Sequence, residues 1–192
     1  MLDHAPRFDE TGAEALAQEL YGIEATAAAL TSERDQNFLL TDTRGIGVVL
    51  KIANALEDPA IIYAQQRVLT HLASRFPLTP RVVLTRTGAP VAQAIGPDAR
   101  RHIVWAITRL PGVPLGTVRR RTPELHEQFG RTIGALSRSL GDFDDPALHR
   151  EFHWDLAQGR QVISDYRGLI ADVELGATVD TLVARFDHHT AL

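Results

Sequence analysis

The pattern of apolar and polar positions changes from helical to strand-like near the start of the chain. Thr11 and Glu14 form a capping box ahead of apolar residues at helical spacing, and Gly22 is placed to end the helix that they predict. Short apolar runs broken by polar turns follow, which is the pattern of strands. These runs are residues 23–30, 37–40 and 46–52. Because only short turns join them, they predict an antiparallel meander.

The next segment predicts a second helix and two further strands. The helix begins at Asp58, which is followed by proline, and its apolar positions continue to about Ser74. Two prolines then break the chain ahead of two more strand-like runs, residues 81–85 and 102–110. The stretch between these runs, 87–101, is rich in glycine and proline, so we expect it to be mostly turn. Up to Leu110 the pattern therefore predicts an α+β lobe.

The second part of the chain, residues 111–192, has a helical pattern. Thr122 and Pro123 open a helix with one apolar face. The residues of this face, which we expect to be buried, are Leu125, Phe129, Ile133, Leu136 and Leu140. Two more helices are expected between Trp154 and Leu192, because apolar positions there again follow helical spacing.

Composition and charge exclude several classes of function. The 192 residues carry a net charge of −4, whereas nucleic-acid-binding domains usually have a basic surplus. The chain has no cysteine, which excludes disulfides and thiolate metal sites. No apolar run approaches the ~20 residues of a membrane helix, and the first residues lack the basic and apolar character of a signal peptide. We therefore expect a cytoplasmic protein that binds neither nucleic acid nor membrane.

Lys51 is the first candidate for a functional residue. Of the 20 lysine and arginine residues, it is the one lysine, and it stands inside an apolar segment, VVLKIAN, that predicts a strand. A buried ammonium group is costly unless an anion or a hydrogen-bond acceptor meets it. A phosphate is one such partner. The alternation of a strand can equally turn Lys51 outward into water, and the sequence leaves both interpretations open.

Gln65 is the second candidate. It follows Ile61 by four positions and shares the apolar stripe of the second expected helix with Val68 and Leu72. A polar side chain on that stripe needs a partner, and a helix packed on the sheet can direct it toward Lys51. The alternative is a glutamine at the edge of the stripe that reaches solvent.

In this order and spacing, these features resemble the aminoglycoside phosphotransferase family, which has a protein-kinase-like fold. The resemblance extends from about Gly12 to the end of the chain, and it is closest to the hydroxylysine-kinase-like branch and to related domains fused to class III aminotransferases. The segments that carry it are SERDQNFLL (32–40), VLKIAN (49–54), AQQRVLTHLA (64–73), ITRLPGVPLG (107–116) and HREFHWDL (149–156). It implies a kinase-like N-lobe over residues 1–110, with an antiparallel sheet plus helices, and the helical start of a truncated C-lobe over residues 111–192.

The resemblance also implies an ATP site. The loop 31–37 would lie over the phosphates, Lys51 would hold the α- and β-phosphates, and residues 108–110 would be the hinge that meets the adenine edge. Gln65 would take the helix position at which kinases usually have a glutamate paired with the lysine. The implied nucleotide-binding residues are Ser32, Asn37, Val49, Lys51, Gln65, Ile107, Thr108, Arg109 and Leu110, with Val49 and Ile107 as apolar walls around the base.

The motif that carries phosphoryl transfer is not found in this sequence. The family places a catalytic Asp and a Mg²⁺-binding Asn in an HxDxxxxN motif. His153-Trp154-Asp155 resembles its start, but the position of the Asn is occupied by Arg160, which cannot bind Mg²⁺. We therefore expect Asp155 to be structural, no catalytic or metal-binding residue in this chain, and the Mg²⁺ ligands downstream of it.

Two functional hypotheses follow, and a third stays open. The first is the nucleotide-binding portion of an ATP-dependent kinase that phosphorylates a hydroxyl of a small amine or amino alcohol, inactive as this portion alone. The second is a non-catalytic nucleotide-binding or docking module of a larger phosphotransferase–aminotransferase fusion. An α+β domain without a ligand is the third, and it leaves Lys51 and Gln65 unexplained. The apolar faces of the last helices also predict a homodimer through this region.

Overall fold

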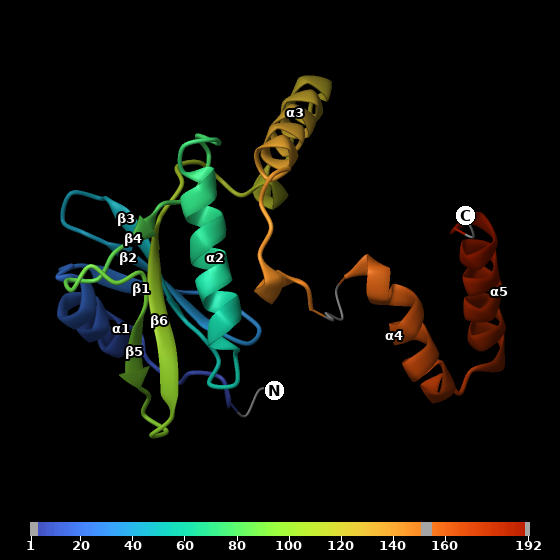
Figure 1. Ribbon diagram of the computed structural model, residues 1–192, viewed down its shortest axis with the longest axis horizontal. Helices are drawn as coiled ribbons and strands as arrows, with labels where there is room; N and C mark the ends of the chain where they lie inside the picture. The colour runs from blue at the N-terminus through green and yellow to red at the C-terminus, as the bar shows by residue number, and fades with distance from the viewer. Residues whose placement is uncertain (1–3, 151–154, 191–192) are drawn as a thin grey trace. The chain divides into compact units, whose positions relative to one another are not determined.

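The computed structural model (Figure 1) describes residues 4–150 and 155–190. Packing divides the chain into two units, Met1–Leu148 and His149–Leu192. The expected boundary at Leu110 therefore lies inside the first unit, and the lobe division that it marks stays a prediction.

An antiparallel sheet of six strands is the centre of the first unit. Its order is β1-β2-β3-β6-β4, and β5 also pairs with β6. The strands are β1 Thr26–Leu30, β2 Gln36–Thr41, β3 Gly47–Ile52, β4 Val82–Val83, β5 Ala92–Ile95 and β6 Arg101–Thr108. The expected meander of three strands is thus confirmed as β1–β3, although β1 begins three residues later than the apolar run suggested.

Strand β5 corrects the expectation that residues 87–101 are mostly turn. Strand β6 is long enough to pair with β4 near its C-terminal end, where Val83 faces Ala106, and with β5 near its N-terminal end, where Ala92 faces Val104. A short strand gains its stability from such a neighbour rather than from its own sequence. The glycines and prolines of the stretch instead form the turns on either side of β5.

The turn between β5 and β6 packs against a buried histidine. His102 is 1% exposed, and its Nδ1 donates a 2.9 Å hydrogen bond to the carbonyl oxygen of Ala53, just after β3. Gly96 lies against this ring, because a Cβ there would stand 3.0 Å from His102 Nε2 and 2.8 Å from Asp98 Oδ1. The ring is enclosed and has no room to move away.

We therefore expect Gly96→Ala to lower the free energy of unfolding by about 1–3 kcal/mol, the usual cost of overpacking. Urea unfolding of the two forms measures this difference. Gly116→Ala is the matched control, because nothing lies within 4 Å of the position of its Cβ. Equal stability of Gly96→Ala and the parent chain would show that the turn is not held against His102.

Helix α1 covers one face of the sheet. It runs from Glu10–Leu16, continues as a π-helical segment, Ala17–Tyr21, and ends as expected at Gly22, which has the left-handed φ of 69°. The expected capping box is wrong: Asp9 is the N-cap, and its side chain accepts a 2.7 Å hydrogen bond from the amide of Gly12. The larger core of the unit lies between this helix and the sheet. Its buried members include Leu16, Tyr21, Phe38, Leu40, Leu50, Ile52 and Val104.

Helix α2, Pro59–Leu72, covers the opposite face (Figure 1). Asp58 caps it as expected, since its carboxylate accepts a 2.8 Å hydrogen bond from the amide of Ala60. A smaller core joins the helix to the sheet through Ile62 and Leu69, which pack with Trp105 of β6.

The other side of α2 carries Arg67 and His71, Arg75 follows the end of the helix, and all three contact the segment after α3. Arg67 donates a 2.5 Å hydrogen bond to Asp145, which is buried. His71 Nε2 lies 3.2 Å from a carboxylate oxygen of Asp142, and Arg75 lies 3.8 Å from the other oxygen. Helix α2 is therefore held on two sides, by the sheet and by two aspartates.

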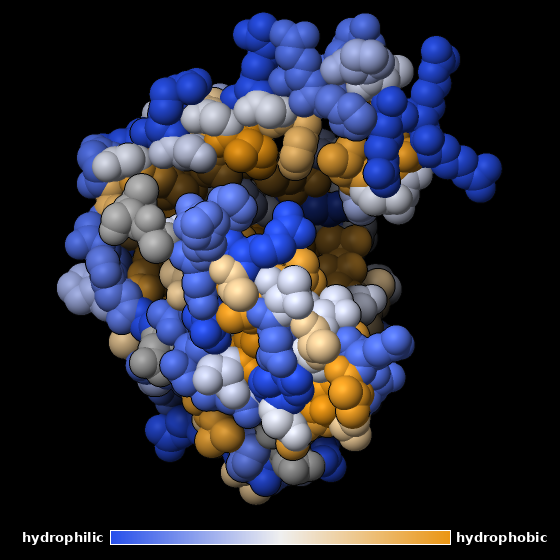
Figure 2. Space-filling view, turned by 90° about the vertical axis from the view of Figure 1, so that its right-hand side faces the viewer, coloured by the Kyte–Doolittle hydropathy of each residue, from blue (hydrophilic) through white to orange (hydrophobic). Residues whose placement is uncertain are grey.

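Helix α3, Pro123–Ser139, forms as expected, with Thr122 as its N-cap. The 3-10 turns Leu115–Thr117 and Pro146–Leu148 flank it. The expected burial of its apolar face is wrong for this structure, since Phe129 is 51% exposed and Ile133 is 46% exposed. Apolar side chains reach the surface among polar ones in Figure 2.

The second unit is a pair of helices, α4 Gly159–Tyr166 and α5 Val173–Thr190, with 3-10 turns Leu156–Gln158 and Arg167–Leu169. The pairs Arg160–Asp187, at 3.1 Å, and Arg167–Asp180, at 2.8 Å, join the two helices. An apolar groove of about 460 Å³ lies between them and includes Leu156, Ile163, Leu182 and Phe186. The homodimer expected through this region stays a prediction. Among the helices of the described residues, none is both long and apolar enough to cross a membrane.

Candidate functional site

Three side chains form a row across the α2 face of the sheet. The strand register pairs Lys51 of β3 with Asn37 of β2 on one side and with Trp105 of β6 on the other. Directly opposite residues of neighbouring strands project from the same face. Lys51 Nζ donates a 2.8 Å hydrogen bond to Asn37 Oδ1 and lies 5.2 Å from the centroid of the Trp105 ring. Lys51 therefore points along the sheet between two neutral partners.

The ammonium group of Lys51 lacks a carboxylate in direct contact among the described residues. Burial lowers the pKa of Lys51, and the negative charge of Asp35 opposes this effect from a greater distance. An amide and an aromatic face stabilise an ammonium group without neutralising it. The site thus holds a partly desolvated positive charge that gains from an anionic ligand.

The loop between β1 and β2 is fastened beside this charge. The carboxylate of Asp35 accepts a 2.9 Å hydrogen bond from the amide of Asn54, and the side-chain amide of Asn54 donates a 3.2 Å hydrogen bond to the carbonyl of Arg34. Arg34 in turn pairs with Glu57 at 3.3 Å. Ser32, at the start of the loop, is exposed. Loop and β3 are therefore joined by the buried Asn54, which sequence reasoning did not single out.

Val49 and Ile107, the two residues expected to be apolar walls around the base, lie side by side in the sheet. They are register partners on β3 and β6, and both are half-buried. Val49 precedes Lys51 by two positions, so strand alternation places both on the same face. Leu39 of β2 faces Val49 from the other side and extends this apolar surface.

The expected hinge follows directly on β6. The amide of Thr108 donates a 2.9 Å hydrogen bond to the carbonyl of Arg81, and the amide of Arg109 donates a 3.1 Å hydrogen bond to the carbonyl of Gly47. Leu110 is exposed, and in the described part of the chain its amide has no backbone partner. Of the three hinge amides, this one is open to a ligand.

Helix α2 presents two glutamines, and they differ in burial. Gln65 is half-buried, and no hydrogen bond to Lys51 is found among the described contacts, so its expected partnership stays a prediction. Gln66 is 4% exposed, and neither its Oε1 nor its Nε2 has a hydrogen-bond partner among the described atoms. It follows Ile62 by four positions, which is the signal in the sequence that could have identified it.

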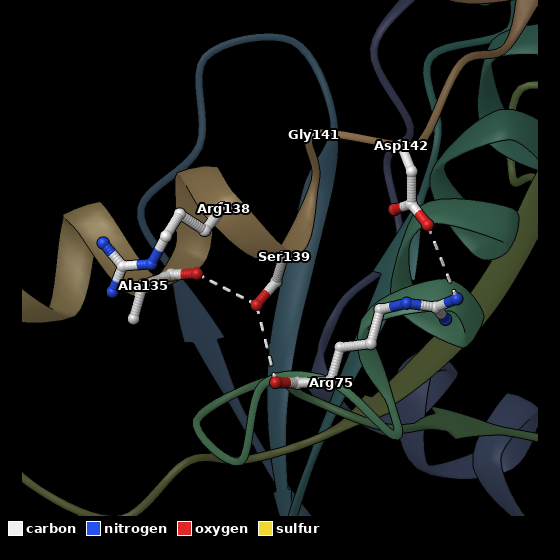
Figure 3. A pocket seen from close by; sticks show the side chains of 6 residues that line it. All are labelled: Arg75, Ala135, Arg138, Ser139, Gly141 and Asp142. Atoms are coloured by element: carbon white, nitrogen blue, oxygen red, sulfur yellow. Dashed lines mark hydrogen bonds and ion pairs between the residues drawn. The ribbon is translucent and has the colours of Figure 1, made fainter.

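A second cavity, of about 600 Å³, lies between the end of α2 and the end of α3 (Figure 3). Arg75 points toward Asp142 across it, and the hydroxyl of Ser139 lies 2.9 Å from the carbonyl of Ala135. Several of its polar groups contact one another in this way, and it is wide open to solvent. We assign no ligand to it.

Asp155 acts as the N-cap of a 3-10 turn, and the structural role expected for it stays a prediction. Its carboxylate accepts a 2.9 Å hydrogen bond from the amide of Ala157 at the start of a 3-10 turn. The other two residues of the motif-like sequence, His153 and Trp154, lie outside the described residues. In residues 4–150 and 155–190, no three acidic or histidine side chains are grouped so that they could hold a metal ion.

Comparison with known proteins identifies the family of this chain. A model of the phosphotransferase enzyme family, APH, matches residues 26–192. The chain belongs to this family. The family expected from the sequence is thereby confirmed, whereas its hydroxylysine-kinase-like branch stays a prediction. A comparison with curated protein sequences gives no significant match.

Two solved kinase structures share the fold of this phosphotransferase-family chain. The amicoumacin kinase hAmiN, in complex with AMP-PNP, Ca²⁺ and Ami, aligns with a TM-score of 0.60 and 16% identity over 81% of this chain and 48% of that chain. The microcompartment-associated aminopropanol kinase aligns with a TM-score of 0.58 and 22% identity over 78% of this chain and 46% of that chain. The chain therefore spans about half the length of each. The kinase-like fold class is confirmed.

Proposed function

We propose that this phosphotransferase-family chain binds ATP through the row at Lys51 and forms the nucleotide-binding portion of a small-molecule kinase. The observation that carries the proposal is the half-buried ammonium group of Lys51, whose direct contacts among residues 4–150 and 155–190 are with neutral side chains. A triphosphate supplies the negative charge that this environment lacks, and charge-assisted hydrogen bonds to phosphate are stronger than neutral ones. The membership of the family supports the same assignment.

The remaining parts of the site fit a nucleotide laid along the same face of the sheet. Lys51 meets the α- and β-phosphates, and the hydroxyl of Ser32 with the loop amides lies over them. Val49 and Ile107 enclose the base from the sheet side. The open amide of Leu110 donates to the adenine edge. Each of these roles is part of the proposal.

The described residues do not fit a Mg²⁺ site, because no group of carboxylates converges on one point. Mg²⁺ supplies charge stabilisation to phosphoryl transfer in this family, and we assign neither its ligands nor a catalytic step to residues of this chain. What the chain contributes is the binding and orientation of the nucleotide.

We further propose that the acceptor is a hydroxyl of a small amine or amino alcohol. One structural neighbour is an aminopropanol kinase, which supports this class. The competing hypothesis, a non-catalytic nucleotide-binding module of a fusion protein, differs in one measurable respect. It requires nucleotide binding without transfer of phosphate to any amino alcohol by the intact protein.

Binding is tested by thermal unfolding of the chain with millimolar Mg-ATP. A ligand at a hundredfold excess over its Kd stabilises the folded state by about 2.7 kcal/mol, so we expect a clear increase in Tm. Adenosine at the same concentration is the matched ligand control, because it lacks the phosphates that reach Lys51 and should shift Tm much less. Equal Tm with and without Mg-ATP would exclude nucleotide binding by residues 1–192.

A further inference from the structure

We propose that Asn37 and Trp105 are positioning residues that hold Lys51 from within the sheet, so that the orientation of Lys51 needs no direct contact with a side chain of helix α2. We call this pair the cross-strand clamp. It deepens the proposed function, because the group that it orients is the one to which we assign the phosphates. Neither side chain was assigned this role by the resemblance, which placed Asn37 in the phosphate loop and the partner of Lys51 on the helix.

The geometry of the cross-strand clamp is set by backbone pairing. Lys51 is paired with Asn37 and with Trp105 in the ladders on its two sides. Directly opposite residues have Cβ atoms only ~5 Å apart, so contact between their side chains follows from the register itself. No residue of α2 is needed to bring the three groups together.

The burial of Trp105 fixes one side of the clamp. The residue is 5% exposed and packs with Ala53, just after β3, and with Ile62 of α2. Its ring therefore has little freedom, and the ammonium group 5.2 Å from its centroid lies within the range of a cation–π contact. On the other side, the 2.8 Å hydrogen bond to Asn37 uses one of the three N–H donors of Lys51.

The chemistry of the two partners suits a residue that must bind phosphate. A carboxylate partner, as kinases usually have, would orient Lys51 but would also offset part of its positive charge. The amide of Asn37 and the π-face of Trp105 orient the ammonium group and leave its charge unpaired. Two N–H donors of Lys51 remain for phosphate oxygens.

The test uses the fact that Lys51 is the one lysine of the chain. Reductive methylation with ¹³C-formaldehyde labels it and the terminal amine, keeps the positive charge and leaves one N–H donor for Asn37. We expect the dimethyl-lysine NMR signal of the folded chain to show an upfield ring-current shift relative to the unfolded chain. Trp105→Phe should reduce the shift, and Trp105→Leu should remove it.

Controls separate the clamp from other causes. Phe129→Leu removes an exposed aromatic ring in α3 and should leave the signal in place. Gln65→Ala and Gln66→Ala change α2 and should also leave it. Asn37→Ala, which keeps Trp105, should broaden or move the signal because the ammonium group loses its acceptor. Circular dichroism shows whether each variant is folded. If Trp105→Leu does not fold, the smaller shift expected for the conservative variant Trp105→Phe tests the clamp instead.

Two outcomes would overturn the clamp. One is a signal at the unfolded position in the folded parent chain, and the other is a loss of the shift in Gln65→Ala or Gln66→Ala equal to that in Trp105→Leu. The Tm of the unlabelled chain with and without Mg-ATP tests the proposed function separately, because the dimethylated Lys51 keeps no N–H donor for the phosphates. If the labelled chain shows the ring-current shift but the unlabelled chain does not respond to Mg-ATP, the clamp is supported and the proposed nucleotide binding is excluded. For Trp105→Phe, we expect the Kd of ATP to rise about two- to fivefold.

Discussion

Lys51→Met should remove most of the stabilisation that Mg-ATP gives to the chain. The phosphates lose a charge-assisted partner, which typically contributes about 1.5–3 kcal/mol, so the Kd of ATP should rise roughly 10- to 150-fold. The fold should tolerate the change, because methionine has a similar length and removes an ammonium group whose burial is unfavourable. Titration calorimetry of the two chains with Mg-ATP measures the difference.

A matched variant shows whether the effect belongs to this lysine. Arg44→Met also removes one positive charge from the sheet region, but Arg44 is exposed in the turn between β2 and β3 and pairs with Asp42 at 2.9 Å. ATP binding should be nearly unchanged in this variant. If Lys51→Met binds ATP as tightly as Arg44→Met does, the phosphates are not at Lys51.

Asn54→Ala should lower the free energy of unfolding and weaken ATP binding together. The residue is 3% exposed, and its side chain donates a hydrogen bond to the carbonyl of Arg34 at 3.2 Å and accepts one from the amide of Leu56 at 3.0 Å. Alanine leaves both backbone groups without these partners, and each unsatisfied buried group costs about 1–3 kcal/mol. The loop that carries Asp35 is then released beside Lys51. Urea unfolding gives the first effect and titration with Mg-ATP gives the second.

The variant Asn54→Asp separates the contribution of the hydrogen bond to Arg34 from that of the hydrogen bond from Leu56. Aspartate can still accept from the amide of Leu56, but it cannot donate to the carbonyl of Arg34. We expect a loss of ATP affinity close to that of the alanine variant if the bond to Arg34 is what fastens the loop. Unchanged stability in Asn54→Ala would contradict the role of Asn54 as the link between loop and β3.

The parts of the site that could be predicted from sequence are those set by local pattern. The strand around Lys51 and the helix that begins at Asp58 follow from apolar periodicity and from capping, which operate over a few residues. Val49 and Ile107 were expected, from the family resemblance, to be apolar walls around the base. The structure pairs them directly across β3 and β6, and their contact with a base stays a prediction.

The parts that could not be predicted depend on register between distant strands. Trp105 lies beside Lys51 only because β6 pairs with β3 in one alignment, and a shift of a single residue would turn it to the other face. The choice between Gln65 and Gln66 depends in the same way on how far α2 is rotated as it packs on the sheet. Strand β5 was missed because its pairing with β6 outweighs the turn-forming residues around it.

The two-sided packing of α2 has a kinetic consequence. Ile62 attaches the helix to the sheet, while Arg67 and Asp145 attach it to the chain beyond α3, so its displacement would break contacts on both sides at once. Lys51 takes its orientation from the strands and not from this helix. If the chain binds ATP as we propose, we expect association at the rate of encounter, without a slower step in which helix α2 first moves.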